Sequence, residues 1–237
     1  MKFLPFLFFT LFSFTLWADP AFEQGRSLYD QGEFEQALES YLQIPGFSAN
    51  LDYNRANTLM RLGRTPEALA YYRRALWQKS SDPDIRANLQ RASTQLEIIL
   101  PPLPLYRRMA GFMTTKQWQW TLIISCWIFA GFGMLQYRIP QFKTAAAWVF
   151  PLAGLLILSS IAGTWATLPA HWTKEAIVMP EHVTARFEPL PDATEHFSIP
   201  QGTLVILGEK SRNWVRIRSG ENQGWIPSDS VISLESL

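Results

Sequence analysis

The sequence predicts a multi-segment membrane protein with three parts: a segment of paired helices, a two-helix membrane hairpin and a small all-β barrel. Three observations indicate this order. Residues 31–44 and 62–76 repeat one helical pattern, two long uncharged stretches follow, and short strand-like runs fill residues 176–237. Because the 237 residues are divided among such different segments, no single large core is expected.

The composition narrows the classes of function. The 21 Lys and Arg residues nearly balance the 20 Asp and Glu residues without a run of like charge, so nucleic-acid binding has little electrostatic support. Many of the 10 Trp and 16 Phe residues lie in the apolar stretches, as expected of a membrane protein. The single cysteine, Cys126, also lies there and can form no intrachain disulfide.

Residues 1–18 have the pattern of a signal peptide. Lys2 precedes an apolar core, and Ala18 is small enough for the position before the cleavage site. An uncleaved anchor is the alternative, because Leu16 fits poorly three positions before the cut. In either case the segment carries the chain from Asp19 onward out of the cytoplasm.

Residues 19–99 contain an internal repeat. Segments 31–44 and 62–76 superpose with an offset of 31 residues, and the matched pairs are Gly32 with Gly63, Ala37 with Ala68, Leu38 with Leu69 and Tyr41 with Tyr72. This pattern resembles the tetratricopeptide repeat (TPR), in which small residues let two helices approach and an aromatic ring fills the remaining space. Two TPR motifs are expected, with small residues Gly25 and Ala56 on their first helices. A capping helix over 85–99 should then cover the open face of the second motif.

The concave face of this repeat is the first candidate binding surface. Guanidinium, hydroxyl and amide groups there suit the backbone or a carboxylate of a protein partner, and they belong to Arg26, Tyr29, Asn54, Asn57 and Arg61. The alternative is an ordinary solvated helical face.

Residues 100–117 connect the helical segment to the membrane. The "LPPLPL" stretch is a stiff linker, and the residues after it mix apolar side chains with Arg107, Arg108 and Lys116, which predicts an interfacial segment.

Residues 118–137 and 144–168 predict a transmembrane hairpin. Both stretches are free of charge and long enough to cross a hydrocarbon core of ~30 Å. The signal peptide places the loop 138–143 in the cytoplasm, so the TPR and β modules lie together outside the cytoplasmic membrane. Ser159 and Gly163 form a small-residue pair that packs either within the hairpin or against another membrane protein.

Residues 174–237 predict a small barrel. The pieces "FSIPQGTLVIL", "NWVRIR" and "GWIP" follow the order found in bacterial SH3-like domains, and the resemblance implies an SH3-like fold. Val215 and Ile217 should fill its core. Trp214 and Trp225 are candidate protein-binding residues, and the alternative is that they cover the core.

No motif for catalysis, a cofactor or a metal ion occurs in the sequence. The histidines His171, His182 and His196 have no glutamate at metal-ligand spacing. Phosphate-binding glycine loops and the HExxH and GxSxG patterns do not occur. We therefore predict a non-enzymatic protein that uses no cofactor, metal ion or small-molecule substrate.

The order of the parts resembles the E-type proteins of bacterial aerotolerance (Bat) operons, as do the "DPDIRANLQRA" stretch and the "GWIP" close. The resemblance implies a membrane-anchored scaffold in an envelope assembly linked to oxygen tolerance. It also implies von Willebrand A-domain membrane proteins as partners, and indirectly a MoxR-type ATPase. The alternative function is a cell-wall module whose barrel binds peptidoglycan.

Overall fold

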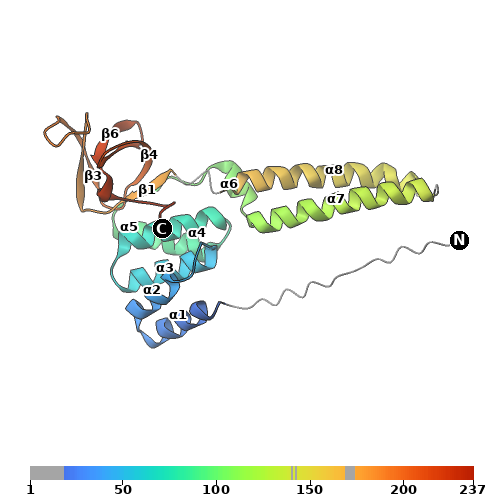
Figure 1. The fold of residues 1–237 in the computed structure, drawn as a ribbon, viewed down its shortest axis with the longest axis horizontal. Coiled ribbons are helices and arrows are strands. Elements are labelled where there is room, and N and C mark those ends of the chain that lie inside the picture. The colour runs from blue at the N-terminus through green and yellow to red at the C-terminus, as the bar shows by residue number, and fades with distance from the viewer. Residues whose placement is uncertain (1–18, 140, 142, 169–173) are drawn as a thin grey trace.

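A computed structural model describes residues 19–139, 141, 143–168 and 174–237, so the predicted signal peptide and His171 lie outside the described residues. The helices are α1 (Pro20–Gln31), α2 (Phe34–Leu42), α3 (Ala49–Arg61), α4 (Thr65–Gln78), α5 (Pro83–Gln95), α6 (Leu105–Ala110), α7 (Thr115–Arg138) and α8 (Lys143–Ala166). The strands are β1 (Glu175–Val178), β2 (His182–Arg186), β3 (Glu195–Pro200), β4 (Leu204–Ser211), β5 (Trp214–Ser219), β6 (Asn222–Pro227) and β7 (Val231–Ser233). A body of helices and sheet lies at one end of the long α7–α8 hairpin (Figure 1).

Helices α1 to α4 form two pairs with the same local design. Each pair turns at a glycine in the left-handed region, Gly32 with φ 85° and Gly63 with φ 75°, where a side chain would be strained. In the first pair, a Cβ atom on Gly25 would lie 2.6 Å from the ring of Tyr41. The small residue on the first helix thus makes room for the aromatic ring on the second, as the repeat pattern predicts.

Helix α5 packs on α4, but the sheet covers another part of α4. Ile177 of β1 and Leu234 after β7 belong to the same buried cluster as Leu69 and Ala75 of α4. The helical segment and the sheet therefore share one core, whereas the sequence predicts separate modules.

The described strands form one seven-stranded antiparallel sheet in the order β3-β2-β6-β5-β4-β1-β7. The sheet is open, because its edge strands β3 and β7 pair with β2 and β1 and not with each other; the closed barrel that the sequence predicts is not formed. Ile177 of β1 and Ile232 of β7 instead pack in one cluster with residues of α4, which contacts both strands. Val215, Ile217 and Ile226 fill a second core within the sheet.

Helices α7 and α8 pack side by side (Figure 1), and each is long and apolar enough to cross a membrane. The two helices approach closely at Gly163, where a Cβ atom would lie 2.3 Å from the Trp118 ring. Gly163 thus packs within the hairpin, while Ser159 is half-buried and its hydroxyl donates to the carbonyl of Leu156.

Candidate functional site

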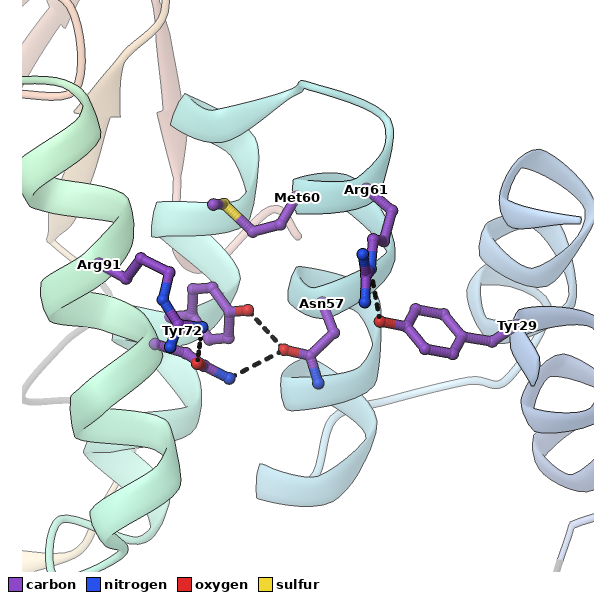
Figure 2. A pocket seen from close by; sticks show the side chains of 7 residues that line it. Tyr29, Asn57, Met60, Arg61, Tyr72 and Arg91 are labelled. Atoms are coloured by element: carbon purple, nitrogen blue, oxygen red, sulfur yellow. Dashed lines mark hydrogen bonds between the residues drawn. The ribbon is translucent and has the colours of Figure 1, made fainter. Parts of the chain in front are cut away.

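A hollow of about 420 Å³ opens between α1, α3, α4 and α5 (Figure 2). We call it the helical groove. Its lining is mostly polar and consists of Tyr29, Asn57, Met60, Arg61, Tyr72, Asn88 and Arg91. Asn57 and Arg61 are one turn apart on α3, and Asn88 and Arg91 are three residues apart on α5. Helical spacing therefore aims each pair into the same space.

Hydrogen bonds hold the floor of the helical groove in place. The side-chain oxygen of Asn57 accepts one bond from the Tyr72 hydroxyl and one, of 3.1 Å, from the amide of Asn88. The Asn88 amide also donates to the Tyr53 hydroxyl over 2.9 Å. Burial raises the pKa of Tyr72, so its hydroxyl keeps its proton and acts as a donor at neutral pH. The amide nitrogen of Asn57 makes no hydrogen bond within the described residues and is available to a ligand.

Two guanidinium groups face the helical groove from different helices (Figure 2). Arg61 donates to the Tyr29 hydroxyl over 3.3 Å, a bond that raises the pKa of Arg61, and Arg91 donates to Asn88 over 2.9 Å. Neither arginine forms an ion pair within the described part of the chain, and no Asp or Glu lines the groove. Two uncompensated cations beside amide and hydroxyl groups suit a carboxylate or the backbone of an extended peptide.

Three of the five predicted concave residues line the helical groove: Tyr29, Asn57 and Arg61. Arg26 is exposed but does not line it. Asn54 is half-buried, and its carbonyl accepts a bond from the Thr58 hydroxyl.

The lining residues that the sequence analysis missed include Tyr72, Asn88 and Arg91. The repeat pattern predicts Tyr72 only as a packing ring, although its hydroxyl reaches the groove. The sequence predicts α5 only as a capping helix. The three-residue spacing of Asn88 and Arg91 is the signal that places both on one face of it.

The two predicted tryptophans of the sheet do not line one site. Trp214 borders a hollow of about 410 Å³ together with His182, Thr184 and Arg186 of β2. Trp225 is half-buried, pairs in register with Arg186 and with Arg216 of β5, and does not line this hollow. Trp214 is therefore the residue of the two that a ligand in this hollow would contact.

Among the described residues, no group of three or more His, Cys, Asp or Glu side chains is placed to hold a metal ion. His196 stacks on Phe187 with ring centroids 4.1 Å apart and lies within 3.1 Å of the Gln223 carbonyl. Cys126, in α7, is a free and exposed thiol.

Comparison with protein-family models, with curated proteins and with solved structures finds no match for this chain. The resemblance to TPR, bacterial SH3-like and Bat E-type proteins therefore rests on the sequence motifs alone and stays a prediction.

Proposed function

We propose that the chain is a membrane-anchored scaffold without catalytic activity, whose helical groove binds a segment of a protein partner. In this proposal α1 to α4 are two TPR motifs, the sheet is an SH3-like module, and both lie outside the cytoplasmic membrane. The partners are von Willebrand A-domain membrane proteins of a Bat-type envelope assembly, with a MoxR-type ATPase as an indirect partner.

The helical groove is the observation that carries the proposal. Its polar groups are fixed by hydrogen bonds among themselves, so little ordering remains to be done when a ligand binds. Arg61 and Arg91 supply positive charge on two walls, and the amide of Asn57 offers a free donor between them. Such a site matches the charge and hydrogen-bonding groups of an acidic peptide segment.

Charge reversal tests the groove. The full chain is co-expressed with a candidate von Willebrand A-domain protein and purified in detergent, and the co-purified partner is quantified. Arg61→Glu and Arg91→Glu should each lower recovery about tenfold, because a close charge pair across an interface contributes at least ~1.5 kcal/mol. Arg26→Glu is the matched control, since Arg26 is an exposed cation outside the groove. If neither groove variant differs from this control, the contact lies elsewhere, with the membrane helices as the next candidate.

Reporter fusions test the proposed topology. Alkaline phosphatase fused after Lys79 or at Leu237 should be active outside the cytoplasm, while a fusion at Gln141 should be inactive. Inactive fusions at both Lys79 and Leu237 would reverse the orientation.

Binding of peptidoglycan is the second candidate function, favoured by the hollow beside Trp214. Because the sheet shares its core with the helices, the test uses the full chain in detergent, sedimented with purified peptidoglycan. Trp214→Ala should abolish pelleting without loss of circular dichroism if this function is correct, while Trp225→Ala should leave pelleting intact. The scaffold proposal predicts that the unmodified chain does not pellet.

A further inference from the structure

The short helix α6 joins the body to the membrane hairpin, next to the end of α8 (Figure 1). On a water-exposed helix the charged side chains face solvent and the large apolar ones are buried, and α6 has the opposite arrangement. Leu105, Met109 and the following Phe112 are 67%, 69% and 66% exposed, whereas Arg107 is completely buried. Three large apolar side chains thus point away from the protein at the place where the chain meets the membrane.

Positive charge surrounds these apolar side chains. Residues 105–117 contain three basic residues and no Asp or Glu. Arg108 and Lys116 are exposed and form no ion pair within the described residues. The guanidinium nitrogens of Arg107 find no hydrogen-bond partner there either, and burial lowers its pKa to about 10. Arg107 is still charged at neutral pH and adds to the local positive potential.

The body approaches the ends of the hairpin at a second point. Phe47, in the loop between α2 and α3, borders a hollow of about 240 Å³ together with Thr114 and Lys116 near the start of α7 and Thr167 after α8. Phe47 is 45% exposed. It therefore lies close to the level at which both spans would leave the hydrocarbon core.

We propose that α6, Phe112 and the tip of the α2–α3 loop form a seat by which the body rests on a layer of anionic phospholipid headgroups. The proposal rests on the assignment of α7 and α8 as membrane spans. Leu105, Met109 and Phe112 enter the boundary between headgroups and acyl chains, and Arg108 and Lys116 contact the phosphates.

Two features favour a lipid surface as the occupant. The seat is continuous with the spans, since only a few residues separate Phe112 from the start of α7. Tyr106 of α6 also packs on Trp165 of α8 with ring centroids 5.5 Å apart, at the level where aromatic side chains anchor membrane proteins. The seat would fix how the body, and with it the helical groove, is oriented over the membrane.

A fluorescent probe at Met109 tests the seat. In a Cys126→Ser background, Met109→Cys carries an environment-sensitive label, and the full chain is placed in vesicles of phosphatidylcholine with or without phosphatidylglycerol. Resistance to carbonate extraction first establishes that the chain is integral to the vesicles. The control is Leu190→Cys, at an apolar side chain that is 53% exposed in the β2–β3 loop of the sheet.

With anionic lipid, the label at Met109 should emit at shorter wavelength and be quenched much less by iodide than the label at Leu190. Neutral lipid, or Arg108→Glu with Lys116→Glu, should restore quenching, since each basic side chain near an anionic surface shifts the docking equilibrium constant about fivefold. Equal quenching at both positions would overturn the proposal. So would shielding that persists unchanged in neutral lipid, which would show that the anionic headgroups do not hold the seat. Neither outcome depends on the helical groove binding a partner.

Discussion

Replacing Glu175 by alanine should destabilise the helical segment and the sheet together. Glu175 is the first residue of β1 and is 6% exposed. It accepts hydrogen bonds from Arg73 Nε and Nη2 over 2.8 and 3.0 Å, and from Trp77 Nε1 over 2.9 Å. Both donors belong to α4, so one side chain joins the two halves of the shared core.

The size of this destabilisation follows from the burial of Arg73. The side chain of Arg73 is only 3% exposed, and without Glu175 it keeps one hydrogen bond within the described part of the chain, from Nη1 to the carbonyl of Pro101. Leaving a buried charge without its partner lowers the free energy of unfolding by about 3–5 kcal/mol. For a body of this size, that loss lowers the melting temperature by about 6–20 °C. The double variant Arg73→Met, Glu175→Leu should recover most of it, because neither partner of this ion pair is then left buried without the other.

Thermal unfolding of the full chain in detergent, followed by circular dichroism and tryptophan fluorescence, measures the effect. Glu195→Ala is the matched control, because its side chain is 67% exposed and lies 3.5 Å from Arg186. Such a surface pair contributes about 0–1 kcal/mol. A shift for Glu175→Ala no larger than that of the control would refute the reasoning. Separate transitions of helices and sheet, with only one of them shifted, would refute the shared core.

Three further substitutions test the packing. Gly25→Ala should destabilise the chain by about 1–2 kcal/mol in thermal unfolding, because overpacking against the neighbouring tyrosine ring outweighs the better helix propensity of alanine. Gly163→Ala should force Trp118 aside and change its near-ultraviolet dichroism, whereas Gly131→Ala, where the added Cβ meets no atom of the described residues within 4 Å, should not. Arg107→Met should leave the melting temperature unchanged or raise it, since replacing a buried charge by an apolar side chain is neutral or stabilising by about 1–4 kcal/mol; a lower melting temperature would indicate a partner for this guanidinium.

The sequence predicts much of the fold because several elements carry a periodic pattern of their own. Small residues and tyrosines at repeated spacing locate the helical pairs, and uncharged length locates the hairpin. Alternation locates β5, where Val215 and Ile217 are buried and Arg216 and Arg218 are exposed. The sequence does not predict β3 as a separate strand. Ile199 is its one fully buried residue, so this edge strand shows little alternation of apolar and polar residues.

The shared core could not be predicted, because it depends on contacts between segments far apart in the chain. Ile177 and Leu234 look like ordinary core residues of a small barrel, and nothing local shows that they face α4. Arg73 and Arg74 look like solvated residues of a polar helix face, yet both are buried in ion pairs. The groove could be predicted only in part. The spacing of Asn57 and Arg61 on one helix places both on the same face, but their position opposite Arg91 depends on how α5 packs against that helix.

The contact between α4 and the sheet has a consequence for how the chain matures in the cell. Arg73 and Glu175 are 102 positions apart, and Arg74 reaches the carbonyl of Leu237 across 163 positions. The whole α7–α8 hairpin, which we propose to span the membrane, is synthesised between these partners. The helical segment therefore emerges early without the strands that complete its core, and its apolar surface stays uncovered until α7, α8 and the strands have been synthesised. During this interval the nascent chain is a substrate for chaperones and proteases, so only chains in which the sheet reaches α4 should survive to maturity.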